Sequence, residues 1–233
     1  MPIGVIESLD HEARGITRLD GKRIFVDGAL PGETVEYASF RRKPNYELAH
    51  LVGVHSASVA RVTPRCEHYG ICGGCAMQHL EGAAQVAVKQ RILEDSLWHL
   101  GRVRPGQMLP PIFGESWGYR HRARLGIRKV PSGGGMLIGF HERRSSYIAD
   151  IRSCSVLPPH VSALLLPLRE LFAALSIADK LPQVEVAVGA KCTALLLRIL
   201  EPLSVRDEEL LHQFADHHQI VFYLQPKGPD SAY

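Results

Sequence analysis

The sequence contains few cysteines and no long apolar run. Its five cysteines are an odd number in a chain of 233 residues, and the N-terminus has no charged-then-apolar signal pattern, which disfavours a secreted fold held by disulfide bonds. No apolar stretch approaches the length that crosses a bilayer. We therefore expect a globular protein of the cytoplasm, with reduced cysteines and no membrane partner.

The excess of positive over negative charge is also small. The formal net charge of +3 is too small to identify a nucleic-acid partner, so only the distribution of charge can point to one. One basic segment, residues 116–129, contains five Arg or Lys residues and no Asp or Glu. In a second one, Arg41, Arg42 and Lys43 precede a proline. A solvated hairpin tip and an RNA contact both explain the second segment.

The first basic segment alternates like a strand. Tyr119, His121, Ala123, Leu125 and Ile127 fall on one face, which is predicted to pack. The other face carries a row of arginines: Arg120, Arg122, Arg124 and Arg128. Guanidinium groups about 6.8 Å apart along a strand suit phosphate contacts. Because no acidic residue lies nearby in sequence, RNA contact and a solvated or salt-bridged face both stay open.

Three of the cysteines lie within ten residues of one another: Cys66, Cys72 and Cys75. Two thiolates separated by two residues can reach one soft metal centre if the backbone between them turns sharply. Gly73 and Gly74 permit such a turn, and they leave N–H groups that can face the sulfurs.

The remaining cysteines are farther along the chain. Cys154 is the best candidate for a fourth thiolate, whereas Cys192 opens an apolar run and is predicted to lie in the core. A triplet with a distant single cysteine favours an iron–sulfur cluster over zinc, which usually shows two short-spaced pairs, and both metals stay open. His68 and His79 flank the triplet and could replace a cysteine.

The chain order predicts an α+β fold. Residues 1–52 contain short strands separated by turn residues, which predicts a small β-barrel, and a strand at 51–55 could close it. A helix is expected from Leu80 to Leu100, with an apolar stripe of Val86, Leu93, Leu97 and Leu100 facing the core. Residues 53–233 then form a strand-rich α+β domain.

Within this second domain the predicted elements follow in a regular order. A flexible loop at 131–135 joins the arginine strand to strands at 136–141 and 147–151, which makes a meander. An apolar helical segment at 158–176 is interrupted by Pro167. Strands at 184–188, 194–199 and 220–224 follow, with a helix before the last one that starts at Ser204, capped with Asp207.

Several short motifs lie along the chain: Pro64-Arg65-Cys66, Cys72-Gly73-Gly74-Cys75, Gln78-His79-Leu80, Tyr119-Arg120, Ile138-Gly139-Phe140 and Cys154 after Asp150-Ile151. Together they resemble the uracil-C5 RNA methyltransferases, and among them the enzymes that act on bacterial 23S ribosomal RNA. The resemblance covers essentially the whole chain. It implies a [4Fe-4S] cluster held by Cys66, Cys72, Cys75 and Cys154.

The first 52 residues carry a resemblance of their own. The pattern of glycines and apolar residues is similar to the TRAM domain, an OB-like β-barrel that binds RNA in several RNA-modification enzymes. It comprises Gly15 to Gly21, Phe25-Val26 and the run from Ala29 to Glu33. The resemblance to the methyltransferase family implies that 23S ribosomal RNA is the partner. No obligate protein partner is indicated. The candidate RNA contacts are Arg120, Arg122, Arg124, Arg128, Arg41 and Arg42.

The family's catalytic domain is a Rossmann-like fold that binds S-adenosylmethionine and lies C-terminal to the segments described above. We find no glycine-rich strand-to-helix turn for that cofactor, and no thiol in a nucleophile setting, so no catalytic or S-adenosylmethionine-binding residue is assigned. The chain is expected to be the RNA-recognition and iron–sulfur portion of such an enzyme, inactive alone. A stand-alone, non-catalytic iron–sulfur RNA-binding protein is the alternative.

Overall fold

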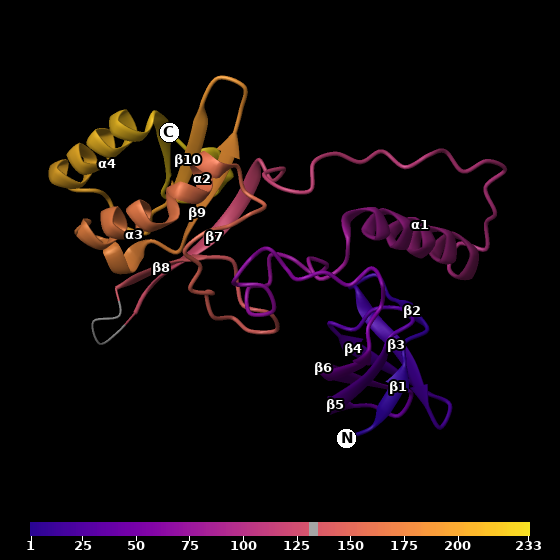
Figure 1. Ribbon diagram of the computed structural model, residues 1–233. Coiled ribbons are helices and arrows are strands. Elements are labelled where there is room, and N and C mark those ends of the chain that lie inside the picture. The colour runs from indigo at the N-terminus through magenta and orange to yellow at the C-terminus, as the bar shows by residue number, and fades with distance from the viewer. Residues whose placement is uncertain (131–134) are drawn as a thin grey trace. The chain divides into compact units, whose positions relative to one another are not determined.

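The strands of this protein form two separate sheets (Figure 1). The computed structural model describes residues 1–130 and 135–233. The contacts divide it into unit 1, residues 1–67 and 75–114, and unit 2, residues 68–74 and 115–233. The mixed α+β class expected from the sequence is confirmed.

Unit 1 contains a six-stranded sheet in the order β1-β5-β6-β4-β3-β2. β1 and β2 are consecutive, so one short segment of chain pairs with β5 at its start and with β3 at its end, and the sheet curls into a barrel-like shape. Every neighbouring pair is antiparallel except β4 and β6, which run parallel. The strands are β1 (Ile3–Val5), β2 (Ser8–Leu9), β3 (Arg14–Leu19), β4 (Lys22–Asp27), β5 (Thr34–Arg42) and β6 (Tyr46–Ser56).

The interior of this sheet is apolar because alternate residues of each strand point inward. Ile24, Val26, Val35 and Tyr37 are at most 1% exposed and pack into one cluster. At the β3–β4 turn, Asp20 and Gly21 both adopt positive φ, which is typical of the turns that join two twisted antiparallel strands.

The chain after β6 is held to the sheet by a buried ion pair. Glu33 is 0% exposed, and its carboxylate accepts hydrogen bonds from Arg61 Nε at 2.5 Å and Arg61 Nη2 at 2.7 Å. Burial raises the pKa of Glu33, but the bonds from Arg61, Leu30 and Ser58 outweigh it and lower that pKa. This pair joins the chain after β6 to the sheet, and the domain boundary expected after residue 52 stays a prediction.

Helix α1 (Gly82–His99) confirms the helix predicted after the cysteine triplet. Its predicted packing is wrong: in the described chain none of its residues is buried, Leu93 is 51% exposed, and Leu100, just beyond the helix, is 85% exposed. Helical spacing shows which side chains share a face, but it cannot show what covers that face. The guanidinium of Arg104 lies 3.9 Å from the ring centre of Trp98, so this indole contacts a cation.

Unit 2 contains a five-stranded sheet in the order β11-β10-β9-β7-β8. Helix α3 packs beside β8 and helix α4 beside β11 (Figure 1). α4 connects β10 to β11, which are parallel, whereas the other pairs are antiparallel. The strands are β7 (Arg122–Lys129), β8 (Met136–Gly139), β9 (Gln183–Val188), β10 (Thr193–Arg198) and β11 (Ile220–Gln225). The helices are α2 (Pro159–Ala163), α3 (Leu165–Ala174) and α4 (Val205–His218), with 3₁₀ turns at Ala178–Lys180 and Pro229–Ser231.

Two predictions in unit 2 change in the structure, and a third is not tested. Residues 147–151 form no strand; Ile148 makes an isolated bridge with His141, and Ala149 N–H donates to Phe140 O at 2.9 Å. β7 begins at Arg122, so Tyr119 and His121, expected on the packed face, are exposed. The alternation in the sequence begins at residue 119, whereas the pairing of β7 with β9 begins only at Arg122. The predicted loop at 131–135 lies outside the described residues, apart from Gly135.

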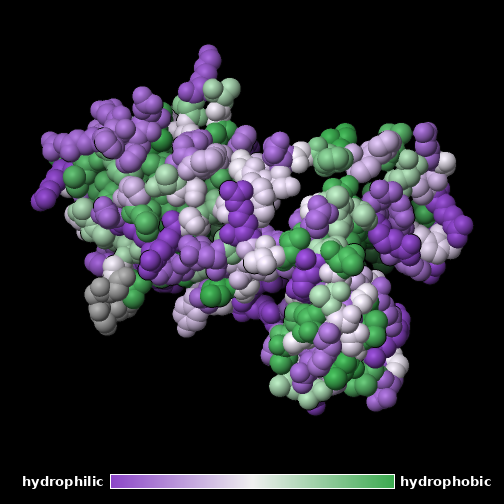
Figure 2. Space-filling view, in the orientation of Figure 1, coloured by the Kyte–Doolittle hydropathy of each residue, from purple (hydrophilic) through white to green (hydrophobic). Residues whose placement is uncertain are grey.

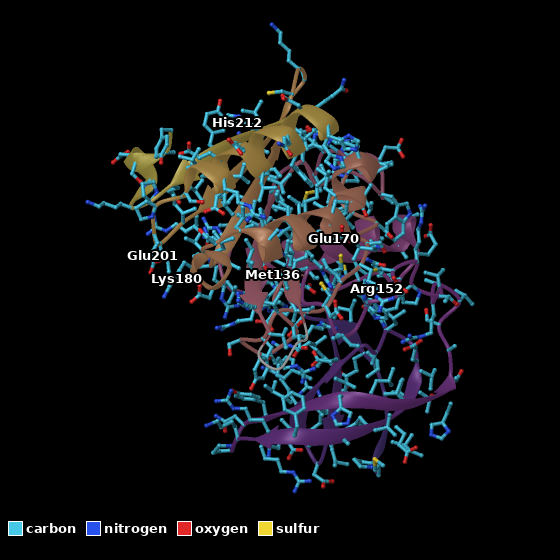
Figure 3. All side chains as sticks on the ribbon, turned by 90° about the vertical axis from the view of Figure 1, so that its left-hand side faces the viewer. Met136, Arg152, Glu170, Lys180, Glu201 and His212 are labelled. Carbon is cyan, nitrogen blue, oxygen red and sulfur yellow. The ribbon has the colours of Figure 1, made fainter. Side chains whose placement is uncertain are left out.

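The helical segment breaks three residues earlier than the proline that was expected to interrupt it. Leu164 is both the C-cap of α2 and the N-cap of α3, so Pro167 lies in the first turn of α3. A proline is tolerated there because the first N–H groups of a helix have no partner within the helix. In the 3₁₀ turn after α3, Lys180 Nζ lies 3.5 Å from Glu201 Oε1. Figure 3 labels both residues.

The start of α4 is a buried, hydrogen-bonded polar site of unit 2. Ser204 and Asp207 form the predicted capping box, each accepting a hydrogen bond from the backbone N–H of the other. Asp207 is 2% exposed and also accepts bonds from Ser176 N at 2.8 Å and Ser176 Oγ at 2.5 Å. Burial raises the pKa of Asp207, but the bonds from Ser176 and Ser204 lower it to about 2.

Among the described residues, no helix combines the length and the apolar character needed to span a bilayer.

Candidate functional site

The four candidate metal ligands are divided between the two units. Cys66 and Cys75 belong to unit 1, and Cys72 and Cys154 belong to unit 2. The three cysteines of the triplet are half-buried, whereas Cys154 is 7% exposed.

The prediction that Cys192 lies in the core is wrong. It is exposed and precedes β10, in the turn that Gly189 N–H closes by bonding to Cys192 O at 2.9 Å. Strand β10 begins one residue later, at the buried Thr193.

The loop at 68–74 docks on the chain that follows β8. Gly73 N–H donates to His141 O at 2.8 Å, and Arg143 N–H donates to Ile71 O at 2.9 Å. A Cβ atom at position 73 would lie 2.8 Å from His141 O, a distance that real Cβ atoms essentially never show. Glycine is therefore required at 73 by the close approach of two backbones.

Gly74 has a related role. Its N–H donates to Cys72 Sγ at 3.4 Å, which confirms that a glycine N–H faces a sulfur of the triplet. A Cβ at this position would lie 3.0 Å from the ring of Phe140. Neither Gly73 nor Gly74 has positive φ; in this loop that conformation belongs to Gly70, at 93°. The two glycines thus serve packing rather than the sharp turn that the sequence suggested.

Arg120 points toward this loop. Its guanidinium lies 4.6 Å from the centre of the Phe140 ring, and Arg120 Nη1 lies 3.5 Å from Gly74 O. Its backbone N–H donates to Val156 O at 2.8 Å, two residues beyond Cys154. Arg120 precedes β7 and is half-buried, so it is separate from the exposed row of arginines on that strand.

The backbone around Cys154 is fixed from both sides. Cys154 N–H donates to Ser162 Oγ at 2.8 Å, and Arg152 N–H donates to His68 Nε2 at 3.0 Å. Arg152, labelled in Figure 3, thereby ties the segment before Cys154 to the start of the cysteine loop. Asp150 forms an ion pair at 2.6 Å with Arg169 of α3.

The donor chemistry can be compared with what an iron–sulfur cluster needs. In the part of the chain that the structure describes, no group of three or more His, Cys, Asp or Glu side chains is arranged to hold a metal ion. Each unit taken alone supplies two cysteines. The all-sulfur donor set, with the N–H of Gly74 facing Cys72, nevertheless has the chemistry that such a cluster takes.

Strand β7 shows the predicted alternation over its own length. Ala123, Leu125 and Ile127 are buried. Arg122, Arg124 and Arg128 are exposed on the other face.

The row of arginines does have an acidic neighbour. Arg124 pairs with Glu185 across the β7–β9 ladder, with Arg124 Nη2 2.8 Å from Glu185 Oε1. The second basic cluster lies at the β5–β6 hairpin tip. This position fits both a solvated tip and an RNA contact. There Arg42 Nε lies 3.6 Å from Glu47 Oε2, and Arg41 is exposed.

Comparison with known proteins adds what the geometry alone does not give. No family model matches the chain. Over all 233 residues, the chain is 74% identical to the 23S rRNA (uracil(1939)-C(5))-methyltransferase RlmD of Dechloromonas aromatica (strain RCB), of which it covers 54%. The chain is similar over its full length to the RlmD methyltransferases. The resemblance predicted from its motifs is confirmed.

Two further relatives agree. RlmD of Cupriavidus metallidurans is 61% identical over 238 residues, and RlmD of Burkholderia pseudomallei (strain K96243) is 59% identical over 236 residues; the chain covers 51% of each. The chain therefore spans about half the length of the curated RlmD proteins it matches.

A solved structure supports the fold. The chain matches the Pyrococcus abyssi tRNA (uracil-54, C5)-methyltransferase, crystallised with S-adenosyl-L-homocysteine, with a TM-score of 0.65 and 20% identity. The match covers 99% of this chain and 53% of that one. At this identity the likeness establishes the fold alone.

Sequence reasoning missed two residues that shape the candidate site. The ring of Phe140 packs against Gly74 on one hand and Arg120 on the other. Glu185 forms an ion pair with Arg124 of the arginine row. Phe140 belongs to a motif that was noticed, so its presence was visible but its partners were not. Glu185 lies in a predicted strand, and only the pairing register reveals that it opposes Arg124.

Proposed function

We propose that these 233 residues are the RNA-recognition and iron–sulfur portion of an S-adenosylmethionine-dependent methyltransferase that modifies a uracil C5 of 23S ribosomal RNA. The observation that carries the proposal is the 74% identity to an RlmD protein along the whole chain. Because the chain spans about half of such a protein, methyl transfer is assigned to the whole protein, and residues 1–233 alone are proposed to be inactive. Its place of action is the cytoplasm, where ribosomal RNA is made.

Cys66, Cys72, Cys75 and Cys154 are proposed to hold a [4Fe-4S] cluster. A cluster ligated by four thiolates would cross-link the triplet to a residue far along the chain. The protein's own contribution is to orient the sulfurs: the N–H of Gly74 faces Cys72, and Ser162 fixes the backbone at Cys154. Arg120 places a positive charge beside the cysteine loop, where it would partly offset the negative charge of a thiolate-ligated cluster.

The RNA contacts are proposed on two basic surfaces, one in each unit. In unit 2, Arg122 and Arg128 project from β7, whereas Arg124 shares its charge with Glu185. In unit 1, Arg41 and Arg42 lie at the hairpin tip of the barrel-like sheet, which is proposed to be a TRAM-like RNA-binding domain. Arg120, the remaining candidate, contributes to RNA binding only if it leaves Phe140.

The test uses the whole protein that contains this chain, purified without oxygen. We expect about four irons and four sulfides per chain, and transfer of labelled methyl from S-adenosylmethionine to C5 of a uracil in unmodified 23S ribosomal RNA. Cys154→Ser should reduce the iron content, and the matched control Cys192→Ser, at the exposed turn, should leave it unchanged. One zinc without sulfide would contradict the cluster, and RNA binding without methylation would favour the non-catalytic alternative.

A further inference from the structure

Phe40 is an exposed phenylalanine placed by a β-bulge. The antiparallel ladder between β5 and β6 shifts register between Ser39 and Arg41, so Phe40 is the extra residue of β5. Its exposed fraction is 45%. Bulges re-aim a side chain that would otherwise continue the alternation of a strand. The sheet thus turns a large aromatic ring toward solvent, although burying it would be favourable.

A second ring lies parallel to the first. The ring centres of Phe40 and His50 are 6.3 Å apart, and their planes differ by 19°. His50 is exposed on β6, opposite the small Ala38 of β5 and beside Asp27 of β4. Two roughly parallel rings on a sheet surface form a platform on which a planar ligand can stack.

The charge around the platform favours an anionic ligand. Arg41, Arg42 and Lys43 follow Phe40 directly and are exposed. The nearby carboxylate of Glu47 is already engaged, since it accepts hydrogen bonds from Lys22 Nζ at 3.0 Å and Ser39 Oγ at 2.6 Å.

Figure 2 shows apolar and polar residues interspersed over unit 1, and some exposed aliphatic residues belong to the same strands as the platform: Val52 and Val54 of β6. Aliphatic side chains suit a protein partner as well as they suit bases. Arg42 is paired with Glu47, but the parallel rings and the exposed Arg41 and Lys43 distinguish the Phe40 end of this surface, because stacking faces and phosphate-binding groups together are what single-stranded RNA requires.

We propose that Phe40 and His50 form a stacking platform for a nucleobase of single-stranded RNA, with Arg41 and Lys43 binding the neighbouring phosphates. This proposal rests on the proposed function, since it assigns one base-binding site to the RNA-recognition portion. It adds a sequence-independent contact, because every unpaired base has a face that can stack on a ring.

The test measures binding of the 233-residue chain to a single-stranded ribosomal RNA segment by fluorescence anisotropy at several salt concentrations. Phe40→Ala should weaken binding by about 5- to 150-fold, the range measured for losing one base stack. Its salt dependence should stay unchanged because no phosphate contact is lost. Phe40→Tyr should restore binding, and Arg41→Ala should lower the slope of log affinity against log salt by roughly 0.7.

Val54→Ala is the matched control, an exposed apolar truncation on the adjacent strand. Circular dichroism establishes that each variant is folded. Equal affinities of Phe40→Ala and Val54→Ala would overturn the platform while leaving the proposed function intact. Failure of the parent chain to bind ribosomal RNA at all would instead contradict the proposed function.

Discussion

Replacing Asp207 with Asn tests how much the polar site at the start of α4 stabilises unit 2. The carboxylate accepts two hydrogen bonds from Ser176 and closes the capping box with Ser204. Asn keeps the volume of the side chain, but it removes the charge and one acceptor. The donors of Ser176 and Ser204 would then be left incompletely paired in a site where Asp207 is 2% exposed.

The magnitude follows from the pKa. Folding lowers the pKa of Asp207 from 3.8 to about 2, which corresponds to about 2 kcal/mol of stability. Because the folded pKa is the lower one, this stability is fully present above pH 4 and is lost as the pH falls toward 2. Asp207→Asn should therefore lower the free energy of unfolding by about 2 kcal/mol at pH 7, and the difference from the parent should shrink by about 1 kcal/mol at pH 3.

The assay can isolate unit 2. The chain has two tryptophans, Trp98 in unit 1 and Trp117 in unit 2, so a Trp98→Phe background leaves Trp117 as the single reporter of urea unfolding. Asp216→Asn, at an exposed position of the same helix, is the matched control and should change stability by less than about 0.5 kcal/mol. A difference between Asp207→Asn and the parent that is equal at pH 7 and pH 3 would refute the linkage argument.

Two other predictions concern the candidate site. Gly73→Ala should reduce the iron content of anaerobically purified protein, because its Cβ would meet His141 O at 2.8 Å; full iron content with unchanged stability would show that the loop does not need this approach. Arg122→Ala should lower the salt slope of RNA binding by roughly 0.7, while Arg124→Ala, whose guanidinium is paired with Glu185, should lower it less. Identical slopes for the two variants would contradict the role assigned to the ion pair.

Elements governed by local rules were predictable from the sequence. The alternation of Ala123, Leu125 and Ile127 gave the buried face of β7, and Ser204 with Asp207 gave the first turn of α4. Both signals act over a few residues: side chains alternate along a strand, and a cap bonds to N–H groups of the next turn.

Features that depend on register or on distant partners were not predictable. No residue near Arg124 in sequence indicates that Glu185 lies opposite it. The residues of β4 and β6 likewise do not indicate that these strands run parallel. The exposure of Cys192 depends on where a hairpin turn ends, since a shift of one residue moves a side chain from the core to solvent. The same limit applies to the cysteines: spacing groups the triplet, but only the fold brings His141 and Arg152 to its loop.

The docking of the cysteine loop has a consequence for the newly made chain. Residues 68–74 contact backbone at His141, Arg143 and Arg152, about 70–80 residues later in the sequence, so at a synthesis rate of about 5–20 residues per second the triplet waits about 4–16 s for its partners. During that interval the loop of Cys72 lacks the backbone contacts that hold it in the folded chain. The loop that carries the triplet can therefore take its native shape only after synthesis has passed Arg152, which makes its geometry a late result of folding.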